Sequence, residues 1–225
     1  MDIIIYAPSW FFGYDSIAEI ISMFILFFIG FYSSKLYKLS QQKKYKHFYL
    51  SFMVLGVAFF AKSITNWIMY REWVEHDIYI GKVIELYFIY NVGYLIHVLL
   101  SLTAYMLLLL LLWDIHDRRL ISLFFIFIVI AAFFAHQTFI SFHVVSLILL
   151  CYLTWEFWKN AHNSKIKTRP KTAYLVFSSF LVITLSQLVF LFMNSTPLLY
   201  VAGEIVQLTG YVMLLVTLLI LFLRK

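Results

Sequence analysis

Seven runs of apolar residues follow one another along this chain, and each is close to the roughly 20 residues that an α-helix needs to cross the hydrocarbon core of a bilayer. Only 12% of the 225 residues are charged and 64% are hydrophobic, whereas a soluble domain carries about 25% charged residues. We therefore predict an all-α integral membrane protein, a multi-pass bundle of seven transmembrane helices that forms one domain over residues 1–225 of a cell-membrane protein. The predicted spans are 16–36, 48–70, 89–113, 119–136, 138–158, 172–193 and 199–223.

Two boundaries do not follow from the length of the apolar runs alone. The stretch 119–158 is too long for one span, and His136-Gln137-Thr138 is the polar break near its middle, so we divide it there. Residues 1–15 precede the first span and include Trp10 and Tyr14, amphipathic rings of the kind that collect at headgroup depth. We expect this segment to lie at the outer surface of the membrane.

The basic residues predict the orientation of the bundle. Lys and Arg collect in cytoplasmic loops, and here all of them except Lys62, Arg71 and Lys82 fall in alternate loops and at the carboxyl terminus. The amino terminus is therefore predicted to lie outside and the carboxyl terminus in the cytoplasm. The excess of Lys over Arg, together with abundant Ile and Phe, favours a prokaryotic source.

The net charge of +6 has a simple explanation in this arrangement. Basic loops beside membrane spans set the topology and contact anionic lipid headgroups, so we expect no nucleic acid as a partner. The loops Lys35–Lys46 and Lys159–Lys171 could also bind a membrane or cytoplasmic protein.

The two halves of the chain follow a similar plan. Tyr94 and Tyr105 match Tyr200 and Tyr211 at one constant offset, on either side of the fourth span. This is consistent with a parallel 3+1+3 duplication, and transporters built from such repeats place substrate between the halves. In topology the chain resembles the small sugar-carrier family of two three-helix repeats, although the prolines inside the first helix of each of that family's halves have no counterpart here.

Polar residues inside membrane spans are costly and by default face a bundle interior or a site. Five polar residues lie within roughly 7–12 Å of the outer ends of their spans, at 1.5 Å per residue: Lys62, His97, His143, Gln187 and Glu204. The amides Asn66 and Gln207 follow Lys62 and Glu204 on the same helical faces. The inner halves, such as Leu107–Leu112 and Leu214–Leu223, are almost purely apolar and predict a sealed plug. We therefore expect an outward-facing pocket. Its candidate ligand-binding residues are Lys62, Asn66, His97, His143, Gln187, Glu204 and Gln207.

The same polar layer has two other interpretations. In the first, Lys62 and Glu204 form a buried ion pair, the histidines bond to backbone groups, and the layer only fixes helix register. In the second, His97 and His143 hold a haem or a metal ion between them. Our primary expectation is that the protein has no cofactor.

No catalytic motif appears, since the chain lacks a phosphate loop, a nucleophile elbow and a metalloprotease spacing, and we predict a protein that is not an enzyme. The pattern Gly203-Glu204-x-x-Gln207-x-x-Gly210-Tyr211 and the basic stretch after the first span resemble the seven-span input modules of prokaryotic histidine kinases. That resemblance implies a sensor-like or receptor-like module that signals to a partner. The alternatives are a small-solute or ion transporter and a structural subunit of a membrane complex.

Overall fold

The computed structural model describes residues 8, 10–11, 13–75, 80–113, 115, 117–135, 139–163 and 170–223. The described residues form seven α-helices and no strand, which confirms the predicted all-α fold. The helices are α1 (Tyr14–Ser40), α2 (Lys43–Glu75), α3 (Ile80–Leu112), α4 (Arg118–Ala135), α5 (Phe139–Asn163), α6 (Pro170–Leu191) and α7 (Pro197–Leu223).

Six of these helices, all except α4, contain described stretches long and apolar enough to cross a membrane. The protein is therefore a multi-pass helical membrane protein. The helix α4 has 18 residues, close to the lower limit for a span, and begins with Arg118 and Arg119. A seventh crossing by α4 stays a prediction.

The helix bounds refine the predicted spans. The division inside 119–158 is confirmed, because α4 ends at Ala135 and α5 begins at Phe139, while 136–138 lie outside the described residues. The region Lys35–Lys46 was predicted as a loop and is mostly helix. There α1 continues to Ser40, Gln41 closes it with a left-handed φ of 54°, and α2 starts at Lys43. Helical hydrogen bonds continue past the apolar run because they do not depend on lipid.

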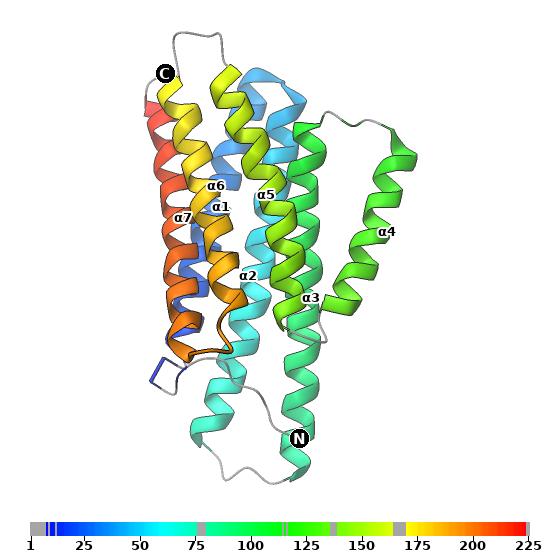
Figure 1. Ribbon diagram of the computed structural model, residues 1–225, viewed down its shortest axis with the longest axis vertical. Helices are drawn as coiled ribbons and strands as arrows, with labels where there is room; N and C mark the ends of the chain where they lie inside the picture. Colours follow the sequence, from blue (N-terminus) through cyan, green and yellow to red (C-terminus); the bar gives the residue numbers. More distant parts are fainter. Residues whose placement is uncertain are drawn as a thin grey trace.

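Six helices form a closed ring, because each contacts the next, and α4 stands apart from them (Figure 1). Neighbours in the ring follow the order α1, α2, α3, α5, α6, α7 and back to α1, while α4 lies outside and contacts α3 and α5. Because α4 returns the chain to the other end, α5 runs parallel to α3, and α7 runs parallel to α1. Corresponding helices of the two triplets, α1–α3 and α5–α7, thus lie opposite each other, as a duplication would require. The duplication itself stays a prediction.

The two ends of the ring differ in charge. We call basic end the end where α1, α3, α5 and α7 finish, which is uppermost in Figure 1, and acidic end the opposite one. Lys38, Lys46 and Arg119 lie at the basic end, whereas Asp15 and Glu19 lie near the acidic end.

Side chains on both faces of the helices are apolar, for different reasons. Leu26, Ile29 and Leu102 are fully buried between helices, where close packing holds the bundle together. Phe24 and Phe28, one turn apart on α1, are more than half exposed. A water-exposed helix would not carry such a stripe, so this outer face is suited to contact with lipid.

Candidate functional site

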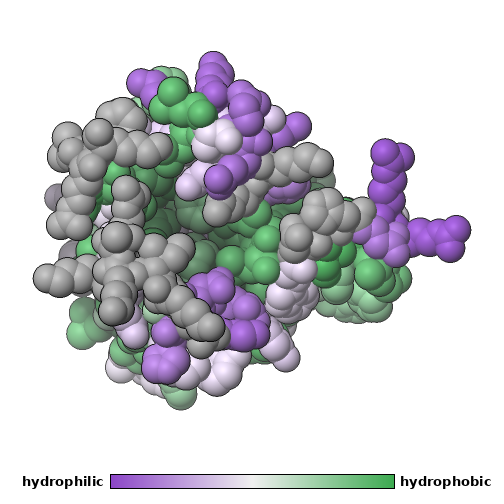
Figure 2. Space-filling model, turned by 90° about the horizontal axis from the view of Figure 1, so that it is seen from above, coloured by the Kyte–Doolittle hydropathy of each residue, from purple (hydrophilic) through white to green (hydrophobic). Residues whose placement is uncertain are grey.

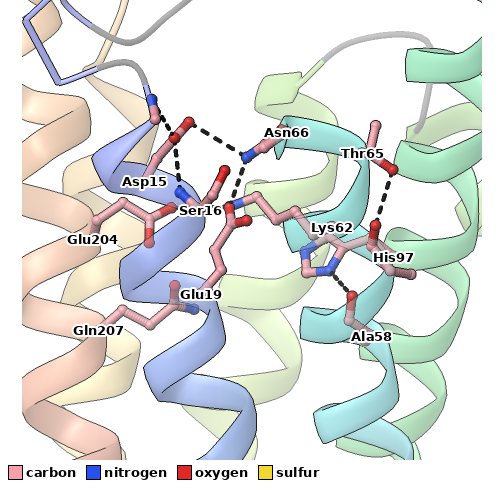
Figure 3. A network of polar contacts seen from close by, with 12 residues as sticks. Asp15, Ser16, Glu19, Ala58, Lys62, Thr65, Asn66, His97, Glu204 and Gln207 are labelled. Atoms are coloured by element: carbon pink, nitrogen blue, oxygen red, sulfur yellow. Dashed lines mark hydrogen bonds and ion pairs between the residues drawn. The ribbon is translucent and has the colours of Figure 1, made fainter. Parts of the chain in front are cut away.

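Lys62 on α2 is the centre of a buried polar cluster near the acidic end (Figure 3). Its Nζ lies 2.8 Å from Oε1 of Glu19 on α1 and 2.9 Å from Oε1 of Glu204 on α7. Lys62 is only 9% exposed, so its ammonium group is held inside the ring instead of extending to the surface. The predicted Lys62–Glu204 ion pair is therefore present, and Glu19 is an additional partner.

Asn66 and Asp15 extend the cluster toward the start of α1. Asn66, one turn after Lys62, donates its Nδ2 hydrogens to Glu19 Oε1 at 2.9 Å and to Asp15 Oδ2 at 3.4 Å. Asp15 Oδ1 accepts the backbone N–H groups of Gly13 at 3.0 Å and Ser16 at 2.8 Å. A carboxylate in the first turn also interacts favourably with the helix dipole. We call Asp15, Glu19, Lys62, Asn66 and Glu204 the acid–lysine cluster.

The acid–lysine cluster contains more acid than base. Asp15, Glu19 and Glu204 are each at most 3% exposed, and Lys62 is the one ammonium group that the structure places among them. Buried charges are costly unless they are paired. Within the described part of the chain, Glu19 Oε2 and the hydroxyl of Ser16 are buried with no hydrogen-bond partner. The cluster therefore has the capacity to take up a further positive charge, such as a proton.

The two predicted histidines are buried beside this cluster. His97 Nδ1 lies 3.0 Å from the backbone oxygen of Ala58, and His143 Nδ1 lies 2.7 Å from Gln187 Oε1. Both acceptors are oxygens, so each Nδ1 carries the donated hydrogen and each neutral ring keeps Nε2 as an acceptor. The Nε2 atom of His143 has no hydrogen-bond partner among the described residues.

A small cavity connects the cluster with the histidines. It has a volume of about 10 Å³, and its polar walls are formed by Lys62, His97, His143 and Gln207, with four aromatic rings completing it. A space of this size holds about one water molecule. No group of three or more metal-binding side chains occurs among the described residues, and whether the protein holds a haem or a metal ion stays a prediction.

The seven candidate site residues thus meet in one region. Lys62, Asn66 and Glu204 belong to the acid–lysine cluster, His97, His143 and Gln207 line the small cavity, and Gln187 orients His143. Whether they bind a ligand stays a prediction.

Asp15 and Glu19 were not among the candidate site residues predicted from the sequence. Both are buried inside the ring. A signal was available, because they are four residues apart and Ser22 and Leu26 continue the same face of α1 into the core.

A larger cavity lies at the basic end, within the inner halves of the spans that were predicted to be sealed. It has a volume of about 340 Å³, and we call it the basic-end chamber. Figure 2 looks at the molecule from this end and shows a hollow with hydrophobic walls among hydrophilic side chains. All six ring helices contribute, with Leu36, Phe48, Leu112, Phe157, Val176 and Leu218 among the lining residues.

The predicted outward-facing pocket stays a prediction. The polar layer encloses space for about one water molecule, and the larger hollow lies at the other end of the ring. The Leu-rich runs that were expected to seal the bundle do so in part, because Leu108 and Leu109 are buried in the core. The same runs also supply Leu111, Leu112, Leu214 and Leu218 to the chamber walls.

Comparisons with protein-family models, with curated proteins and with solved structures find no match for this chain. Fold and site together define a class of protein. It is a multi-pass helical membrane protein with a six-helix ring, a buried charged cluster near one end and an apolar chamber at the other.

Proposed function

We propose that the six-helix ring is a carrier that moves a solute along its central axis by alternating access. One observation carries this proposal: side chains from both triplets close the axis near the acidic end, while the axis is hollow at the basic end. Carriers built from two related halves bind substrate between the halves and open to one side at a time. With the basic end in the cytoplasm, as the charge distribution predicts, this conformation faces inward.

The seams between the triplets support a rocking movement. The triplets contact each other along α1 and α7 and along α3 and α5. Lys62 crosses the first seam to reach Glu204, and aromatic contacts cross the second, with the ring centroids of His97 and Phe142 5.5 Å apart. Contacts of this kind can be exchanged without unfolding a helix.

Lys62 is suited to a seam that opens and closes. Glu19 belongs to the same triplet as Lys62, whereas Glu204 belongs to the other. Opening the acidic end therefore breaks the pair with Glu204 and leaves Lys62 paired with Glu19. Since an unpaired buried charge is expensive, this second partner lowers the cost of opening.

The sensor hypothesis is the second candidate. It depended on an outward-facing pocket, and the described residues enclose there a space of about 10 Å³. The observation that still favours it is the unsatisfied Nε2 of buried His143, a residue that lines that space. A sensor would bind its ligand there without moving it across the membrane.

Cysteine accessibility tests the carrier proposal. Cys151, the one cysteine of the chain, is exposed on α5 and can be replaced by Ser. Gln207→Cys then places a thiol beside the small cavity, and Thr217→Cys places one in the basic-end chamber. We expect a membrane-impermeant maleimide to label the Thr217→Cys protein from the basic side, and to leave the Gln207→Cys protein unlabelled from the acidic side.

The decisive step adds Glu204→Gln, which weakens the seam contact and leaves Lys62 paired with Glu19. Labelling of Gln207→Cys from the acidic side should then rise, while labelling of Thr217→Cys falls. Val216→Cys, on the exposed face of α7, is the matched control and should not change. A rise at both positions would mean general loosening, and no change at either would mean a fixed scaffold. Each of these results contradicts a carrier.

A further inference from the structure

We infer that the basic-end chamber binds the hydrocarbon chain of a single-chain anionic amphiphile, such as a fatty-acid carboxylate, with the charged head at the lysine-bearing ends of α1 and α2. This inference deepens the proposed carrier function and rests on it for the transport role. It adds the chemical class of the molecule that occupies the chamber.

The size and walls of the chamber favour an apolar chain. Its volume of about 340 Å³ lies at the lower end of the range of small-molecule sites, roughly 300–1,000 Å³. Leu, Val and Phe side chains from all six ring helices form most of its surface. Such walls stabilise an apolar occupant by removing its surface from water.

Two of the three hydroxyl-bearing residues that line the chamber, Ser33 and Thr217, argue against a hydrophilic solute, and the third is Tyr45. Ser33 donates its hydroxyl hydrogen to the Ile29 carbonyl at 2.7 Å, and Thr217 donates to the Met213 carbonyl, also at 2.7 Å. Both donors are therefore occupied within their own helices. A sugar or an amino acid would lose its hydration in the chamber and gain little in exchange from these two groups.

The charge around the mouth selects an anionic head. Lys38 near the end of α1 and Lys46 in the first turns of α2 are exposed at the basic end, close in sequence to the chamber residues Leu36 and Tyr45. The described charged residues of this end are mostly basic. They are Lys35, Lys38, Lys46, Arg118, Arg119 and Lys159, against Asp117 and Glu156. Figure 2 shows hydrophilic side chains beside the hydrophobic hollow. An amphiphile would place its charged head at these side chains and its hydrocarbon chain in the hollow.

Photo-crosslinking tests the inference directly. The protein is reconstituted in phosphatidylcholine nanodiscs with a palmitic acid that carries a diazirine in its chain, and the crosslinked peptides are mapped by mass spectrometry. We expect crosslinks to residues that line the chamber, and unlabelled palmitate should compete for them in a saturable manner. Crosslinks confined to exposed residues such as Val212 and Val216 would show lipid contact alone and overturn the inference.

Adjacent positions on α7 supply matched variants. Thr217→Phe fills the chamber, whereas Val216→Phe adds the same ring to the exposed face of the helix. Chamber crosslinking should fall about tenfold for Thr217→Phe, the effect of a modest steric penalty, and stay unchanged for Val216→Phe. Equal crosslinking in both variants would overturn the inference. If Thr217→Phe fails to fold, saturable competition by palmitate in the unaltered protein decides.

The charged head has its own test. A diazirine hexadecanol of the same chain length should crosslink in the chamber several-fold less than the fatty acid, and equal crosslinking would overturn the anionic head. The measurement detects binding without transport. If the fatty acid crosslinks in the chamber but the cysteine labelling does not shift from Thr217→Cys to Gln207→Cys, the ligand class is retained and the carrier is contradicted. If the labelling shifts but no chamber crosslinks form, the carrier is retained and the ligand class is contradicted.

Discussion

At the scale of single residues, Lys62 joins more helices near the acidic end than its neighbours in the acid–lysine cluster do, since it links α2 to both α1 and α7. One ammonium group pairs with carboxylates from α1 and α7, and Asn66 adds hydrogen bonds to the same region. A buried ion pair adds little to stability compared with well-packed apolar groups, but the loss of one partner is expensive because the other charges stay buried. Lys62 is therefore more important for the arrangement of the helices than for the total stability of the bundle.

Lys62→Met should strongly destabilise the protein, by roughly 3–5 kcal/mol, because it leaves Glu19 and Glu204 without their cation. Adding Glu19→Gln should recover part of this loss, since it removes one of the unpaired acids. Thermal unfolding in detergent measures both effects. Lys35→Met is the control, because Lys35 is exposed and lies over the Phe31 ring, 4.7 Å from its centre. Similar losses for Lys62→Met and Lys35→Met would show that the cluster is not a buried unit.

At the scale of elements, close contact between α6 and α7 holds the second triplet together. Gly210 is a point of close approach, because a Cβ atom there would lie 2.5 Å from Ile183 Cγ1 and 3.1 Å from the Ile183 backbone nitrogen. Small residues at helix interfaces permit this approach in membranes, where packing supplies much of the association energy. Any side chain at this position would push the two helices apart.

Gly210→Ala should therefore destabilise the bundle by about 1–3 kcal/mol, the usual cost of overpacking. Thr209→Ala, at the adjacent exposed position, should have little effect beyond the loss of its bond to the Ile205 carbonyl. The unfolding temperature, measured for both variants in the same detergent, should therefore be lower for Gly210→Ala than for Thr209→Ala. A neutral effect of Gly210→Ala would mean that α6 and α7 separate easily and do not belong to one rigid triplet.

At the scale of the whole molecule, the ring and the outlying α4 together decide the topology. The two triplets are parallel in the structure, and if α4 crosses the membrane, the chain ends lie on opposite sides of it. The basic residues then place the carboxyl terminus in the cytoplasm. This arrangement gives both triplets the same orientation around the axis, as the carrier proposal requires.

Terminal fusions test this topology. Green fluorescent protein fused after Lys225 should fluoresce in intact bacterial cells, and an epitope tag before Met1 should be accessible to antibody from outside after removal of the cell wall or outer membrane. If α4 lay along the surface instead of crossing, both termini would be on one side. A result with both tags on the same side would therefore contradict seven spans.

Much of this protein could be predicted from its residues, because helix formation in lipid is a local property. A run of about 20 apolar residues must satisfy its own backbone hydrogen bonds there, so the number and approximate position of the helices follow from the apolar runs. The break between Ala135 and Phe139 and the shared depth of Lys62 and Glu204 were accessible in the same way.

Only the tertiary structure decided which helices are neighbours and which faces they turn inward. Charged residues at the end of a span are often solvated, so the spacing of Asp15 and Glu19 placed them on one face of α1, but only the ring, with α2 and α7 around that face, decided that they are buried. A Leu-rich run can fill a core or line a hollow with equal ease, and the difference depends on the distance between helices remote in the chain. For this reason the basic-end chamber was not predicted, although its lining residues are conspicuous in the printed sequence.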